Sequence, residues 1–144
     1  KRSMTGADGE STTCFIDSNI WLYAFIETQD EKKSELAQSI IRESTIAVST
    51  QVINEVSVNL IKKADFSEKQ VRELIRSFYR KYHIIEANQE VLLSASSIRK
   101  HHHFSFWDSL IMASALHVEA TVLYSEDMQD GFVIGKTTIE NPFK

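Results

Sequence analysis

Short apolar runs alternate along the chain with longer stretches in which apolar residues recur at helical spacing. A short run predicts a buried strand, and helical spacing predicts an amphipathic helix. The predicted strands are 13–17, 46–49, 83–87 and 121–125, with a short edge strand added within 132–139. The predicted helices are 19–26, 31–43, 50–63, 67–82, 88–100 and 106–118. The pattern Ser67-x-x-Gln70 predicts a capping box at the start of the fourth of these helices.

Strands that alternate with helices indicate an α/β fold, with a mainly parallel sheet covered on both faces. The chain of 144 residues suits one domain, and no linker-like stretch divides 13–144. We therefore expect a single domain over 13–144. Residues 1–12 are polar, and we expect a disordered start or a non-native remnant there. In such folds, functional residues follow the carboxyl ends of the strands.

Composition and charge narrow the class of protein. Twenty acidic residues against 16 basic ones give a net charge of −4, which argues against a protein that grips nucleic acid by bulk positive charge. One cysteine, Cys14, cannot form an intrachain disulfide, so no oxidising compartment is implied. No apolar run approaches the length of a membrane span, and we expect a cytoplasmic protein without a membrane partner.

Four acidic residues stand in or at the end of apolar elements, and the predicted sheet brings them to one edge. Asp17 and Asp127 follow predicted strands, and Glu55 and Asp108 lie in helices whose first turns reach the same edge. Each also has a local explanation: a helix cap, a turn or an exposed helix face. Together, however, they would repel one another, and a divalent cation removes that conflict. Oxygen-only ligands favour Mg²⁺ or Mn²⁺ over zinc.

These acids lie in four short motifs that resemble the PIN domain, most closely the VapC-type toxins of bacterial toxin–antitoxin pairs. The motifs are Phe15–Asn19, Asn54–Glu55, Ser105–Ile111 and Tyr124–Met128. The resemblance implies a three-layer α/β/α sandwich with a mainly parallel sheet of four to five strands. It also implies a Mg²⁺- or Mn²⁺-dependent endoribonuclease that hydrolyses RNA phosphodiester bonds. The four family acids match Asp17, Glu55, Asp108 and Asp127.

The same resemblance implies supporting residues and partners. Ser18 and Asn19 match the polar pair that often follows the first acid, and Ser125 matches a small hydroxyl residue two positions before the fourth. We expect Asn19 and Ser125 to position water or phosphate. Asp130 is a candidate for the fifth acid that some members use. The implied partners are an RNA substrate, a cognate antitoxin and a second copy in a homodimer.

Two further patterns have both a functional interpretation and a purely structural one. The run His101-His102-His103 suggests zinc, but three consecutive side chains point in different directions, so an exposed loop is favoured. Basic residues recur at helical spacing on 67–82, and Arg72 and Arg76 are candidates for RNA contact, although such a stripe is usually a solvated face.

Aromatic residues near the motifs are interpreted as core or interface rather than as platforms for bases. Trp21, Tyr23 and Phe25 alternate along one short helix and cannot all face one core, so some are expected to meet a partner. Trp107, directly before Asp108, is interpreted in the same way.

Two rival functions stay open. An aspartate-based phosphatase on a similar fold usually needs Asp-x-Asp after the first strand, whereas Asp17 is followed by Ser18-Asn19. A non-catalytic module that binds RNA or protein would not need all four matched acids.

Overall fold

A parallel sheet runs through the middle of the computed structural model, which describes residues 12–26 and 30–144. Apart from Thr12, the expectation for residues 1–12 lies outside the described residues. The strands are β1 (Thr13–Ile16), β2 (Thr45–Ser49), β3 (His83–Ile85), β4 (Val122–Tyr124), β5 (Val133–Ile134) and β6 (Thr137–Glu140). The helices are α1 (Ser18–Phe25), α2 (Glu31–Glu43), α3 (Thr50–Ala64), α4 (Glu68–Lys81), α5 (Gln89–His101) and α6 (Phe106–His117).

The sheet has the strand order β3-β2-β1-β4-β6-β5. β1 lies between β2 and β4, and all pairs are parallel except β5 with β6. Adjacent parallel strands need a crossover, and the helices between them supply it. The chain moves outward from β1 to β3 and then returns to β4 on the other side of β1. This reversal places the carboxyl ends of β1 and β4 side by side, which is where ligands bind in open α/β sheets.

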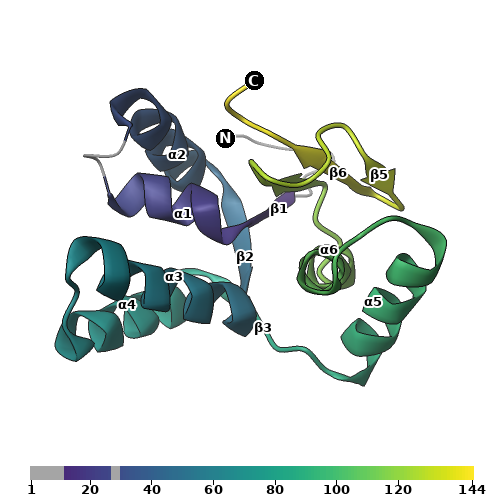
Figure 1. Ribbon diagram of the computed structural model, residues 1–144, viewed down its shortest axis with the longest axis horizontal. Coiled ribbons are helices and arrows are strands. Elements are labelled where there is room, and N and C mark those ends of the chain that lie inside the picture. The colour runs from purple at the N-terminus through teal and green to yellow at the C-terminus, as the bar shows by residue number, and fades with distance from the viewer. Residues whose placement is uncertain (1–11, 27–29) are drawn as a thin grey trace.

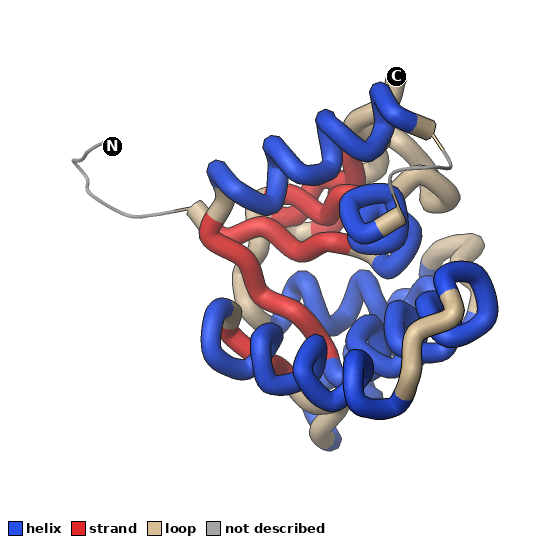
Figure 2. Tube along the Cα trace, turned by 90° about the vertical axis from the view of Figure 1, so that its left-hand side faces the viewer, coloured by secondary structure: helices blue, strands red, loops and turns tan. Residues whose placement is uncertain are grey.

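The helices cover both faces of the sheet and make the expected three layers. Helices α1 to α4 lie on one side of the central strands β1 and β2, and α5 and α6 lie on the other (Figure 1). Figure 2 shows the same arrangement turned by a right angle, seen from the side of Figure 1 on which α1 to α4 lie. The α/β/α fold predicted from the sequence is therefore confirmed.

The end of the chain differs from the expectation in one respect. The segment 132–139 was expected to add one edge strand, but it forms a hairpin of β5 and β6, and the described residues contain six strands. Gly135 has φ +55°, a conformation that permits the tight turn between the two strands. Thr137 donates from its hydroxyl to the Ala120 carbonyl at 2.6 Å and fixes β6 beside β4.

The element boundaries follow local signals in the sequence. The capping box at the start of α4 is confirmed: the Ser67 hydroxyl accepts from the Gln70 N–H, and the Gln70 side chain accepts from the Ser67 N–H. α2 has the predicted bounds, with Asp30 as its N-cap. Among the described residues, no helix combines the length and the apolar character needed to cross a membrane.

Candidate active site

Asp17 lies where β1 ends and α1 begins, and it is held from both sides. It is the N-cap of α1, and its Oδ1 accepts from the Ser18 N–H at 2.8 Å. Its Oδ2 accepts from the Ser125 hydroxyl at 2.8 Å. Only 9% of Asp17 is exposed. The helix-cap interpretation and the site interpretation of this residue therefore both hold, because one carboxylate caps the helix and lies at the strand edge.

The parallel register of β1 and β4 explains why Ser125 reaches Asp17. Ile16 pairs with Tyr124, and the Asp17 N–H donates to the Tyr124 carbonyl at 2.9 Å. The next residue of each strand therefore leaves the sheet at the same level. Ser125 is fully buried, and its Oγ also accepts from the Met128 N–H at 3.2 Å. One hydroxyl thus fixes both the Asp17 carboxylate and the loop that follows β4.

Asp127 lies on that loop and is joined to α1. The Asn19 amide donates from Nδ2 to Asp127 Oδ2 at 2.9 Å, although the two residues are 108 positions apart. The other amide atom, Asn19 Oδ1, is buried and has no hydrogen-bond partner among the described residues. An unpaired buried acceptor is rare in native structures and points to a donor or a cation that meets it in the working site.

Two acids reach the site from α3 and α6. Glu55 is half-buried on α3, beside a buried face formed by Val52, Val56 and Leu60. Asp108 is half-buried in the first turn of α6, where its N–H donates to the Ser105 hydroxyl at 3.1 Å. Ser105 thus caps α6, and the Asp108 carboxylate lies near enough to Asp17 and Glu55 to raise the pKa of both.

Electrostatics show that the four acids share one region. Burial raises the pKa of Asp17, and the nearby Asp108 and Asp127 carboxylates raise it further, while the hydrogen bonds from Ser125 and Ser18 act in the opposite direction. Burial also raises the pKa of Glu55, and the Asp17 and Asp108 carboxylates add to that effect. Such like-charge crowding is typical of functional sites.

The donor set of this region fits a hard divalent cation. It consists of carboxylate oxygens and one unpaired amide oxygen, which suit Mg²⁺ or Mn²⁺ rather than zinc. Among residues 12–26 and 30–144, no three His, Cys, Asp or Glu side chains form a ready cage around an ion. Mg²⁺ rarely needs such a cage, since it keeps several waters and binds through one or two carboxylates.

The remaining predicted site residues lie in other surroundings. Asp130 is exposed, and its carboxylate accepts from the Asn141 N–H at 2.8 Å, which ties the loop to the C-terminal tail. Arg72 and Arg76 are exposed on α4, and Arg76 pairs with Glu73 at 2.7 Å.

The expectation of an exposed loop over His101–His103 is correct only in part: His101 and His103 are exposed, but His101 belongs to α5 and His102 is half-buried. His101 ends α5 and bonds to the Ser97 carbonyl, whereas the His102 ring packs against Phe104 and Phe132.

One polar network beside the site was not anticipated from the sequence. Glu126 directly precedes Asp127, and it forms an ion pair with Lys33 of α2 and accepts from the Tyr23 hydroxyl at 2.8 Å. A cation thus offsets the charge of this additional acid. The spacing of Asn19 and Tyr23, one helical turn apart, is the signal that both face the 125–127 loop.

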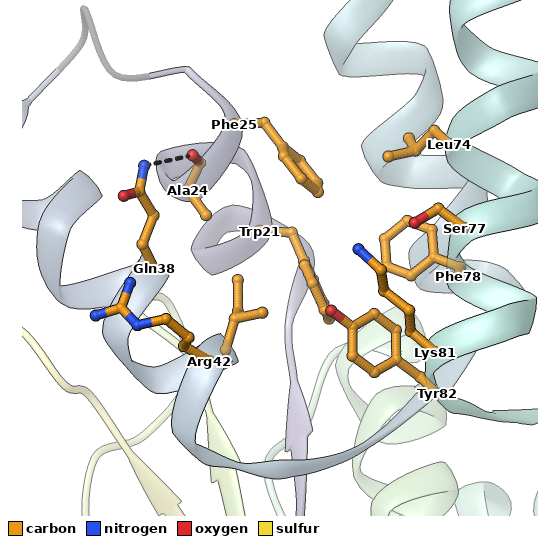
Figure 3. A pocket seen from close by; sticks show the side chains of 11 residues that line it. Trp21, Ala24, Phe25, Gln38, Arg42, Leu74, Ser77, Phe78, Lys81 and Tyr82 are labelled. Atoms are coloured by element: carbon orange, nitrogen blue, oxygen red, sulfur yellow. Dashed lines mark hydrogen bonds between the residues drawn. The ribbon is translucent and has the colours of Figure 1, made fainter.

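The opposite side of α1 borders an apolar pocket of about 540 Å³, shown in Figure 3. Trp21 and Phe25 come from α1, Phe78 and Tyr82 from the end of α4, and Arg42 from α2. The volume lies within the range of about 300–1,000 Å³ that is typical of ligand pockets. The prediction that Trp21, Tyr23 and Phe25 cannot all face one core is therefore confirmed, whereas the partner expected for some of them stays a prediction.

Comparison with known proteins agrees with this description. A family model for the PIN domain matches residues 14–130, and the chain belongs to this family, whose VapC-type members are nucleases. No curated protein matches the chain.

Solved structures resemble the fold. A toxin–antitoxin complex from Klebsiella pneumoniae aligns with a TM-score of 0.67 and 19% identity over 91% of this chain and 98% of that chain. VapBC2 from Rickettsia felis, bound to a promoter DNA fragment, aligns with a TM-score of 0.63 and 20% identity over 90% and 98%. VapC20 from Mycobacterium tuberculosis, a sarcin–ricin loop cleaving toxin, aligns with a TM-score of 0.61 and 14% identity over 76% and 86%.

Proposed function

We propose that this PIN domain is a Mg²⁺- or Mn²⁺-dependent endoribonuclease that hydrolyses RNA phosphodiester bonds and acts as the toxin of a toxin–antitoxin pair. The observation that carries the proposal is the buried Asp17 carboxylate, whose pKa is raised by burial and by neighbouring carboxylates at the edge where β1 and β4 end. Carboxylates crowded in this way do not by themselves stabilise a folded protein. We therefore interpret them as ligands placed to bind a cation.

The residues have distinct roles in this proposal. Asp17, Glu55, Asp108 and Asp127 would hold the ion, directly or through water. An ion held there supplies Lewis-acid activation of the phosphate and of a water molecule. Asn19 keeps Asp127 oriented through its Nδ2 and offers the unpaired Oδ1 to water or phosphate. Ser125 fixes the Asp17 carboxylate through its hydroxyl.

The decisive experiment is an RNA cleavage assay with and without Mg²⁺ or Mn²⁺, alongside a phosphatase assay under the same conditions. Asp17→Asn and Asp108→Asn should each lower cleavage by more than about 100-fold, because even the residues that support metal ligands are worth about 10- to 100-fold. Asp65→Asn, the same change at an exposed residue at the end of α3, should leave cleavage unchanged. Full activity of Asp17→Asn contradicts the proposal.

The same assays separate the rival functions. An aspartate-based phosphatase would release phosphate from a monoester and leave RNA intact, and a binding module would do neither. Asp130→Asn decides whether that residue belongs to the site, since unchanged cleavage leaves it only its contact with Asn141. Charge reversal at Arg72 and Arg76 tests the α4 track, where unchanged RNA affinity indicates a solvated face.

For the antitoxin, we propose the pocket between α1, α2 and α4 as the docking surface. Phe25 is 40% exposed at its edge, and the aromatic walls suit an apolar side chain. Arg42 and Lys81 also line the pocket and suit acidic residues that flank such a side chain.

The test co-expresses this chain with a candidate antitoxin, which is any small protein encoded next to it. Relief of toxicity for the wild type, and no relief for Phe25→Glu, is the expected result. Tyr79→Glu, an exposed aromatic residue of α4 outside the pocket, should still be neutralised. Equal neutralisation of both variants rules out the pocket.

A homodimer is the last part of the proposal. Leu92 and Leu93 are exposed apolar residues of α5, the kind of surface that a second copy covers. Sedimentation velocity should show a dimer for the wild type and a monomer for Leu92→Glu/Leu93→Glu. A monomeric wild type would contradict the proposed homodimer.

A further inference from the structure

Two large aromatic side chains stand exposed directly before Asp108, one of the acids of the candidate site. Phe106 is 58% exposed and Trp107 is 61% exposed. They form the first turn of α6, and Asp108 is the next residue. Trp107 therefore does not belong to the core. Of the two interpretations made from the sequence, core or interface, only the interface remains. An exposed aromatic pair beside a polar site is a surface that marks binding.

The pair is held in a fixed arrangement by a cation. The Arg99 guanidinium of α5 lies 4.2 Å from the centre of the Phe106 ring, and its Nη1 donates to the Ser109 hydroxyl at 2.8 Å. The Ser109 hydroxyl in turn donates to the Phe106 carbonyl at 2.6 Å. The Phe106 and Trp107 rings meet edge to face, with centres 5.4 Å apart. This arrangement limits the side-chain freedom that binding would otherwise remove.

Basic residues precede the pair along the chain. Arg99 and Lys100 lie in the last turn of α5, and Arg99 reaches Phe106 and Ser109 of α6. The order along the chain is thus cations, exposed aromatic rings and then the Asp108 carboxylate. Such a grouping suits a nucleic-acid strand, because its phosphates favour cations, its unpaired bases favour flat rings, and its scissile phosphate must reach the acids.

We propose that Trp107 is the stacking platform for an unpaired base next to the scissile phosphate, and that Phe106, itself held by Arg99, keeps the Trp107 ring in place. The inference rests on the proposed ribonuclease function and adds to it the residue that binds the base of a single-stranded RNA beside the cleaved bond. Proteins read such RNA by stacking its splayed bases on aromatic side chains. A protein partner on the same surface is the competing explanation, and the experiments below separate the two.

The first experiment uses the two tryptophans of the chain. Trp21 is 1% exposed and Trp107 is 61% exposed, so only Trp107 can meet a base. In the cleavage-deficient Asp17→Asn background, a single-stranded RNA oligonucleotide should quench the Trp107 emission. The same titration with Trp107→Phe should leave the Trp21 emission unchanged. Binding without any quenching in the parent protein overturns the platform.

The second experiment measures RNA affinity in the same background. Trp107→Ala should weaken binding of the single-stranded oligonucleotide by about 5- to 100-fold, the usual worth of one base–aromatic stack. Phe106→Ala, which removes only the ring beside Trp107, should weaken it less. Trp107→Phe should recover part of the loss because it keeps a flat ring. Val133→Ala, which removes a similarly exposed apolar side chain (56%) from β5, should have no effect. A fully paired RNA duplex should bind all variants equally, since its bases are already stacked.

An RNA with one abasic position identifies the stacked base. At that position, removing the base should weaken binding to the parent but not to Trp107→Ala. Unchanged affinity of Trp107→Ala, with its fold verified by circular dichroism, contradicts the proposal, and so does a loss of self-association or antitoxin binding in place of RNA affinity. Quenching and binding without cleavage by the wild type would instead contradict the ribonuclease function and leave the platform standing.

Discussion

The two sides of helix α1 have opposite physical character. On one side, Asn19 and Tyr23 face the loop that carries Asp127, and the region contains carboxylates that repel one another. On the other side, Trp21 and Phe25 face α4 and border an apolar pocket. One helix thus separates a region of crowded charge from a region of packed aromatic rings.

The aromatic side of α1 stabilises the fold, whereas the polar side contains a buried charge that lowers its stability. Trp21 is almost fully buried, its Nε1 donates to the Ile16 carbonyl at 3.0 Å, and its ring contacts Phe78 and Tyr82. Asp17 is also buried, but its charge is opposed by its surroundings. Functional sites are commonly less stable than the fold around them permits, because their geometry serves a ligand.

The largest effect is expected on the aromatic side. Trp21→Ala should lower the free energy of unfolding by about 3–5 kcal/mol, because it removes a large buried side chain and leaves a cavity. Urea denaturation followed by circular dichroism measures the loss. Tyr79→Ala, which removes an exposed ring from the same region, should change the free energy far less. Equal effects of the two variants would mean that the aromatic side does not carry the stability assigned to it.

A smaller effect is expected where the polar side meets the core. Ser125→Ala should lower the free energy of unfolding by about 1–3 kcal/mol, because it leaves a buried N–H and one oxygen of a buried carboxylate without a partner. The affected groups are the Met128 N–H and Asp17 Oδ2. Loss of the Ser125 hydrogen bond also raises the pKa of Asp17 further, so the rising limb of the cleavage pH profile should move to higher pH. An unmoved profile would show that Asp17 titrates independently of Ser125.

Much of the fold was predictable because its signals are local. The α2 helix has its predicted bounds, and the capping box of α4 is formed by the two residues that the pattern names. The hairpin of β5 and β6 was not predicted in full, because β5 has only two residues and shows no alternation of its own. Its existence depends on pairing with β6, which the sequence alone does not reveal.

The candidate site was predictable where it depends on strand order, but not where it depends on strand register. Strand order brings residues that follow β1 and β4 to one edge, so Asp17 and Asp127 were found by topology alone. The hydrogen bond from Ser125 to Asp17 depends on the strand register, which the sequence does not specify. The sequence left open whether Trp107 is buried or exposed, because an apolar stretch before Leu110 and Ile111 has the same pattern whether its first turn is covered or open.

The smallest expected effect is a gain in the free energy of unfolding, and it tests the contrast between the two sides of α1 most directly. Without metal at pH 7, Asp17→Asn should raise the free energy of unfolding by about 0.5–2 kcal/mol, the common gain when a site residue is relieved of an unfavourable environment. The pKa of Asp17 is raised from its ordinary value near 3.8, chiefly by burial. The folded state therefore holds the proton to higher pH than the unfolded state, and stability is lost as pH rises through the folded pKa.

Two controls establish the cause of this gain. As the pH falls below 3.8, the advantage of Asp17→Asn should disappear, because the wild-type carboxyl is then neutral in both states. Added Mg²⁺ should raise the melting temperature of the wild type more than that of Asp17→Asn, because a ligand stabilises only the form that binds it. Asp65→Asn should show neither behaviour, since Asp65 is exposed. If Asp17→Asn is less stable than the wild type at every pH, its hydrogen bonds with Ser18 and Ser125 outweigh the repulsion, and the polar side of α1 contributes stability as the aromatic side does.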